Sequence, residues 1–236
     1  MKVEAIIESV RYCIDEEAAN VANFADAPTY DYGGDDNDLM NHIIKAKIGD
    51  ALRWICLYAP ADLLGGSDEK DSSQQPISTG ILVDKTAIPI AITGTNGGKI
   101  VLPQDFVKIA RVRTTGWYRA VKVLLTEDSD EYLQLRDDSG AAATADRPQA
   151  ALIEKSTREI EVWPTGASVE YTYVANVEPK GIEGTGGEIA AYALPPRVKT
   201  SFIYYLAFLL LSAYGDERSG RMLEIAMQNL KITNKQ

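Results

Sequence analysis

The chain has 236 residues, 45% of them hydrophobic, and 34 acidic against 24 basic residues give it a net charge of −10. This length and apolar content are enough for a hydrophobic core, which excludes intrinsic disorder as the main state. The negative charge repels phosphate backbones, so the composition argues against nucleic-acid binding as the function. Two cysteines, Cys13 and Cys56, and one histidine, His42, exclude a disulfide framework and leave few ligands for a transition metal.

The first 64 residues predict two helices. Apolar residues recur at three- and four-residue steps over residues 3–20, which indicates an amphipathic helix. Because the chain enters this pattern directly, we expect no export signal. Helical spacing resumes over residues 39–58, and Pro60 interrupts it.

A polar segment, residues 26–38, lies between these helices and contains five aspartates but no lysine or arginine. Its proline and glycines predict an exposed loop that ends in a helix N-cap at Asp36 or Asp38. The candidate exposed residues of this acidic loop are Asp31, Asp35, Asp36 and Asp38.

Between residues 77 and 178 the period of the apolar pattern changes to two, which predicts a compact antiparallel β region. Large apolar side chains alternate with polar ones in two segments, residues 158–163 and 169–173. Turn-rich pieces separate three further expected strands, at residues 118–125, 132–135 and 150–154.

Two helices are predicted near the C-terminus. Pro195 and Pro196 introduce a helix over residues 197–214, which Gly215 can end, and a final helix follows over about residues 216–230. The uncharged run inside the first of them is shorter than the ~20 residues that a membrane-spanning helix needs, so we expect a buried helix.

The predicted fold class is therefore α+β, with a helical body formed by the N- and C-terminal helices and an inserted antiparallel β region. The helical body comprises residues 1–64 and 195–236, and the inserted β region comprises residues 77–178. Connectors are expected at residues 65–76 and 179–194.

The helix at residues 197–214 is apolar all round, so something must cover every side of it. Either it is the hub of its own domain or an identical neighbour covers its last side. The candidate subunit-interface residues are Phe202, Ile203, Tyr205, Leu206 and Leu209. Charge is also uneven: residues 1–64 carry a net −7 and residues 195–236 a net +3, which favours head-to-tail contact between copies or different partners at opposite poles.

We find no residue set for catalysis, for a cofactor or for a metal, and expect no enzyme activity. The Gly-Gly-Lys step at residues 97–99 lacks the first glycine and the final serine or threonine of a phosphate loop. His42 has neither a nucleophile elbow nor a nearby cysteine, so we assign it to the surface or to helix packing. Cys13 and Cys56 lie within helical patterns and are assigned to the core.

The order of motifs in the β region and its surrounding helices resembles tailed-bacteriophage head-tail connector proteins, also called adaptor, neck ring or tail-tube A proteins. The resemblance covers most of the chain from Leu39 to Leu230. Its motifs are Leu102-Pro103-Gln104-Asp105-Phe106, Trp117-Tyr118-Arg119-Ala120-Val121, Glu131-Tyr132, Arg147-Pro148, Glu161-Val162-Trp163-Pro164 and Tyr171-Thr172-Tyr173-Val174.

This resemblance implies a non-enzymatic subunit of a ring, with twelve copies around an axis, at the neck of the virion. Such a ring docks on the portal protein and joins tail or further ring proteins, and the chain is made in the host cytoplasm. An acidic channel wall suits DNA that passes without specific binding. The resemblance also implies a C-terminal segment that reaches the portal, with Leu230, Lys231, Ile232 and Lys235 as its candidate residues.

Two alternatives from other classes stay open at the level of sequence. The first is a carbohydrate- or ligand-binding β module on a helical stalk, with Trp117, Tyr118 and Trp163 as its stacking surface. The second is a hydrolase that uses loop carboxylates such as Asp128 and Asp130.

Overall fold

The structure is a computed structural model that describes residues 3–21, 34–65, 80–93, 96–136, 143–153, 158–179 and 194–231. The chain divides into two compact units: unit 1 comprises Met1–Ile81 and Val177–Gln236, and unit 2 comprises Leu82–Asn176. The described residues of unit 1 are mainly helical and those of unit 2 mainly strands, so the fold class is α+β, as predicted.

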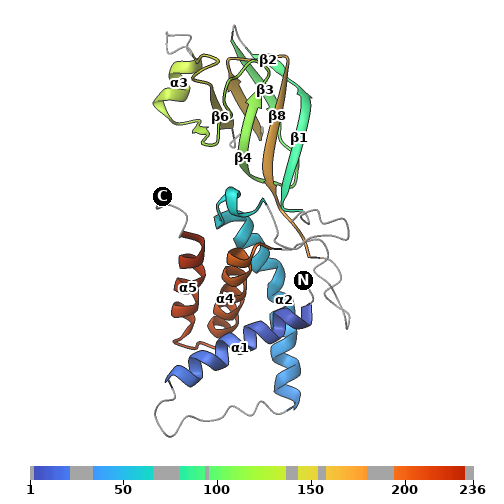
Figure 1. The fold of residues 1–236 in the computed structure, drawn as a ribbon, viewed down its shortest axis with the longest axis vertical. Helices are drawn as coiled ribbons and strands as arrows, with labels where there is room; N and C mark the ends of the chain where they lie inside the picture. Colours follow the sequence, from blue (N-terminus) through green and yellow to red (C-terminus); the bar gives the residue numbers. More distant parts are fainter. Residues whose placement is uncertain are drawn as a thin grey trace. The chain divides into compact units, whose positions relative to one another are not determined.

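Helices form the described part of unit 1. They are α1 (Val3–Val21), α2 (Gly34–Tyr58), the short 3-10 helix η1 (Ala61–Leu63), α4 (Pro196–Ala213) and α5 (Ser219–Lys231). Helix α4 packs against α1, α2 and α5 and therefore occupies the centre of the unit (Figure 1). The predicted helices at residues 3–20, 39–58, 197–214 and 216–230 are confirmed, with shifts at their ends.

The largest of these shifts is at the start of α2, which begins at Gly34. Asp35, Asp36 and Asp38 therefore lie in the first turns of a helix, and the prediction that they belong to a loop is wrong; Asp31 lies outside the described residues. Acidic residues are favourable near a helix N-terminus because of the helix dipole, so a run of aspartates is as compatible with the first turns of a helix as with a loop before it.

Local sequence accounts for the boundaries of α4 and α5. Pro196 opens α4, where a missing N–H costs nothing, and Gly215 follows its end in the left-handed conformation, with a φ of 69°. Before α5, Asp216 Oδ1 accepts the Arg218 backbone N–H at 2.8 Å, and the Arg218 guanidinium donates to Asp216 Oδ2 at 2.6 Å. Hydrogen bonding to Arg218 lowers the pKa of the Asp216 carboxyl. Arg218 Nη1 also donates to the Ile14 carbonyl at 3.4 Å, which ties α1 to this turn.

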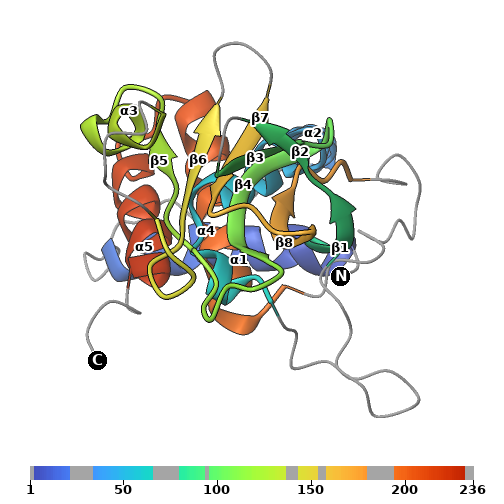
Figure 2. The same ribbon diagram turned by 90° about the horizontal axis from the view of Figure 1, so that it is seen from above.

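Two sheets form the larger part of unit 2, and their strands can be followed in Figures 1 and 2. An antiparallel three-stranded sheet has the order β1 (Leu82–Pro89), β8 (Ser168–Ala175) and β4 (Phe106–Thr114). A five-stranded sheet has the order β2 (Ala91–Thr93), β3 (Gly97–Val101), β7 (Glu159–Trp163), β6 (Gln149–Ile153) and β5 (Leu125–Thr126). The predicted strands at residues 150–154, 158–163 and 169–173 are confirmed, but β5 pairs with β6 in parallel, so the region is not wholly antiparallel.

The predicted strand at residues 132–135 is wrong, because this segment belongs to the helix α3 (Asp130–Arg136). Ser129 Oγ accepts the Tyr132 backbone N–H at 3.3 Å and thus caps the helix. Tyr132 is buried and its ring meets that of Trp163 edge-on at a centroid distance of 6.0 Å. Of the strand predicted at residues 118–125, the structure retains only the pairing of Val121 with β4 and the first residue of β5.

Candidate docking surface

Helix α4 is covered on three sides by its own unit, and this decides the position of the candidate interface residues. Phe202, Ile203 and Leu206 are 0%, 5% and 1% exposed, so they belong to the core of unit 1 and present no surface to another protein. Tyr205 and Leu209 are half-buried. Only these two of the five candidates therefore remain at the surface, and their interface role stays a prediction.

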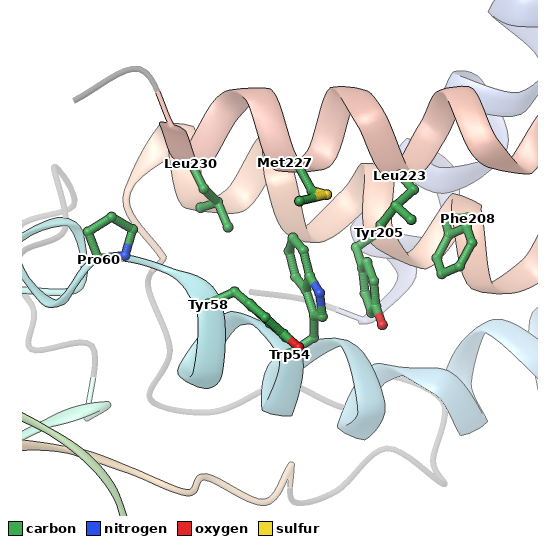
Figure 3. A pocket seen from close by; sticks show the side chains of 8 residues that line it. All are labelled: Trp54, Tyr58, Pro60, Tyr205, Phe208, Leu223, Met227 and Leu230. Atoms are coloured by element: carbon green, nitrogen blue, oxygen red, sulfur yellow. The ribbon is translucent and has the colours of Figure 1, made fainter. Parts of the chain in front are cut away.

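An open apolar groove of about 560 Å³ lies on unit 1 beside Tyr205. Its walls come from α2, α4 and α5, together with Pro60, which stands just before η1. Figure 3 shows their side chains facing one another across the groove. The lining residues are Trp54, Tyr58, Pro60, Tyr205, Phe208, Leu223, Met227 and Leu230. Helix α1 contributes no residue to this lining among the described residues.

Stacked aromatic rings form the floor of the groove. The Trp54 and Tyr205 rings lie 4.1 Å apart between centroids with an interplanar angle of 9°, a stacked arrangement that joins α2 to α4. Tyr58 and Phe208 extend this row at centroid distances of 5.6 Å from Trp54 and 5.4 Å from Tyr205. Burial, with smaller contributions from nearby Tyr58 and Asp50, raises the pKa of the Tyr205 hydroxyl, so this hydroxyl is uncharged at neutral pH.

The edges of the groove expose apolar side chains to solvent. Tyr58 on α2 is 65% exposed and Met227 on α5 is 39% exposed. Along the same face of α2, Asp50 pairs with Lys47 at 3.3 Å and with Arg53 at 3.9 Å. An apolar floor with a charged rim is the usual composition of a protein-protein contact surface.

Sequence reasoning did not find this groove. The signal was present in the spacing: Trp54 and Tyr58 stand four residues apart on α2, and Leu223, Met227 and Leu230 follow one face of α5. Each helix shows its own stripe, but only the packing of three helices brings the stripes to one place.

The candidate portal-docking residues are divided by the structure. Leu230 is 5% exposed and lines the groove, so it is part of the body of α5. Lys231 is the last residue of α5, and Ile232 and Lys235 lie outside the described residues.

The side chains of the proposed carbohydrate-stacking surface do not share a surface. Trp117 is 2% exposed, and its indole N–H donates to the Pro164 carbonyl at 2.8 Å; Trp163 is 6% exposed and packs in the unit 2 core. Tyr118 alone is exposed, at 76%. The two tryptophans are therefore structural, and the stacking platform is not formed.

The described residues offer little for chemistry. In that part of the chain no three His, Cys, Asp or Glu side chains gather closely enough to hold a metal ion. Asp128 and Asp130 are exposed, at the turn before α3 and in its first turn, and neither lines the groove of unit 1. His42 is an exposed residue of α2, and Cys13 and Cys56 are buried free thiols. Over the same described ranges, no helix is long and apolar enough to cross a bilayer.

The described chain has a mainly helical unit, which carries the apolar groove, and a unit built mainly of strands. The family model described as SU10 adaptor protein matches residues 8–232, which is nearly the whole chain. The chain belongs to the SU10 adaptor protein family. This is a phage head-tail adaptor family, so the chain is a structural adaptor of the phage particle, in agreement with the resemblance seen in its motifs. No curated protein matches the chain.

Proposed function

We propose that this adaptor is the subunit of a closed ring in the phage neck, with twelve copies around the axis. One side of the ring docks on the portal protein, and the other side joins tail or further ring proteins. DNA passes through the ring without specific binding. The particle location is the neck-tail junction of the virion.

The groove of unit 1 is the observation that carries this proposal. A monomer that never met a partner would leave Tyr58 and Met227 exposed beside a row of aromatic rings, and continuous apolar patches of this kind mark contact sites. Membership of a phage adaptor family supplies the class of partner, namely other structural proteins of the particle. The net charge of −10 supports a channel that does not hold the genome.

Docking on the portal is assigned in this proposal to residues that follow the body of α5. Leu230 is held in unit 1, so Lys231, Ile232 and Lys235 are the candidates that remain for contact with the portal. Removing residues 232–236 should then weaken portal binding without lowering the thermal midpoint of the chain.

The decisive measurement is particle mass. The purified full chain is examined by mass photometry alone and after mixing with the purified portal protein of the same phage. We expect twelve-copy rings in at least one of the two samples, and negative-stain images of these particles should show a central channel. If the chain stays a single copy in both samples, the ring function is refuted.

A further inference from the structure

A closed ring requires each subunit to have a second contact surface in addition to the groove. In a ring every subunit presents two different surfaces, one that meets the previous copy and one that meets the next, because a contact of one patch with itself closes at a dimer. If the groove of unit 1 is one of these surfaces, a second and different surface must fit it. This step rests on the ring function proposed above.

The groove of unit 1 is apolar, and two of the helices that line it, α4 and α5, carry more basic than acidic residues. The two helices α4 and α5 together contain four basic residues and one acidic residue. On α2, Lys47 and Arg53 flank Asp50 beside the groove, which adds one further net positive charge. A fitting surface is therefore one that offers an apolar side chain among acidic residues.

Helix α1 has a composition of this kind. Helix α1 carries five acidic residues and one basic residue. Its inner stripe, which includes Val3, Val10 and Ile14, is buried in unit 1, whereas Glu8 and Tyr12 lie on the opposite face and are exposed. Tyr12 is 65% exposed, an unusually large fraction for an aromatic side chain on a helix of the body.

We propose that the outer face of α1 of one copy docks in the α2/α4/α5 groove of the next copy, with Tyr12 entering the groove beside Met227. The acidic residues of α1 then face the basic excess of α4 and α5, so the contact is head-to-tail and repeats around the ring. Among the described residues, α1 does not line the groove of its own unit, so the two surfaces are separate parts of one copy, as a ring requires.

Two single substitutions separate the two surfaces. Met227→Glu places a carboxylate in the groove, and Tyr12→Lys places a positive charge on the α1 face. Both positions are partly exposed, so the far-UV circular dichroism and thermal midpoint should stay close to those of the wild type. Under the condition in which the wild-type chain assembles, each variant alone should lose ring formation. Leu39→Glu, at a 53% exposed apolar position of α2 outside the groove, is the matched control and should still assemble.

Mixing the two variants tests the head-to-tail arrangement. Tyr12→Lys retains an intact groove and Met227→Glu retains an intact α1 face, so an equimolar mixture should form discrete pairs that do not grow. A groove-to-groove dimer predicts instead that Tyr12→Lys pairs with itself and that mixing changes nothing. That result overturns the inference.

Cysteine trapping gives a second readout that does not depend on the strength of a single contact. A chain that carries both Tyr12→Cys and Met227→Cys, assembled as the wild type is and then oxidised, should produce a ladder of covalent oligomers on a denaturing gel. The native thiols Cys13 and Cys56 are buried and should contribute little, which the wild-type chain controls.

The failures of the two proposals are distinguishable. If wild-type rings form but the ladder is absent, or if Met227→Glu assembles as the wild type does, the α1-to-groove contact is refuted and the ring function stands. If no ring forms from the wild-type chain, alone or with the portal protein, the ring function itself fails and this contact fails with it.

Discussion

Two leucines on α4 allow a quantitative test of whether this helix is the core of its own unit. Leu206 is 1% exposed, at the centre of unit 1, whereas Leu209 is half-buried. Truncating a fully buried leucine removes its burial energy and leaves a cavity, so Leu206→Ala should lower the free energy of unfolding by about 3 to 5 kcal/mol. The same truncation of half-buried Leu209 should cost only about 1 to 2 kcal/mol.

The assay is urea unfolding followed by far-UV circular dichroism, which reports mainly on the helices of unit 1. With a denaturant slope of about 2 kcal/mol per molar urea, Leu206→Ala should lower the midpoint by roughly 1.5 to 2.5 M and Leu209→Ala by less than about 1 M. Equal midpoint shifts for the two variants would refute this assignment, because they would mean that Leu206 is no more buried by its own chain than Leu209. The candidate interface would then return to the face that carries Leu206.

Three further predictions concern the stability of single features. Burial raises the pKa of Tyr173 to about 12. The neutral Tyr173 hydroxyl therefore contributes fully to the free energy of unfolding below the unfolded pKa of 10.0, and this contribution is lost as pH rises through 12. Tyr173→Phe should remove that pH dependence in alkaline unfolding measurements. A Cβ at Gly166 would collide with the Thr115 carbonyl, so Gly166→Ala should lower the thermal midpoint strongly. Gly220 in α5 has open space around it, so Gly220→Ala should raise the free energy of unfolding by up to about 1 kcal/mol. Similar effects at both glycines would contradict this prediction. Because the pKa of Asp216 is lowered, its carboxylate contributes to the free energy of unfolding above pH 3.8, and this contribution is lost as pH falls below that value. Asp216→Asn should therefore cost about 1 kcal/mol at neutral pH and nothing in strong acid. Urea unfolding at the two pH values measures this difference.

Elements with strong local signals were predictable from the sequence. Apolar periodicity predicts the helices α1, α4 and α5, and Pro196 and Gly215 mark the start and the end of α4. Two-residue alternation of apolar and polar side chains predicts β7 and β8. Local signals failed where two readings fit the same residues. Tyr132 and Leu135 suit a strand by type, but their three-residue spacing and the Ser129 cap make α3 a helix.

The strands with weak alternation were missed for a different reason. β1 and β4 were not predicted, and in the structure each pairs with β8, so their conformation depends on a partner that is far along the chain. Cross-strand pairing supplies the hydrogen bonds that such segments lack locally, and a sequence pattern does not display this partner.

The sequence by itself determined that the chain is an α+β protein with an all-round apolar helix near residue 206, and its motif order indicated the phage adaptor class. Only the tertiary structure decided which sides of that helix are covered by other helices of the same chain. Phe202, Ile203 and Leu206 are buried by helices of the same unit, while Trp54 and Tyr58 from α2 and Met227 from α5 meet beside Tyr205 to form a groove. The physical reason is that periodicity records which residues avoid water, whereas the neighbour that shields them depends on how separate helices pack.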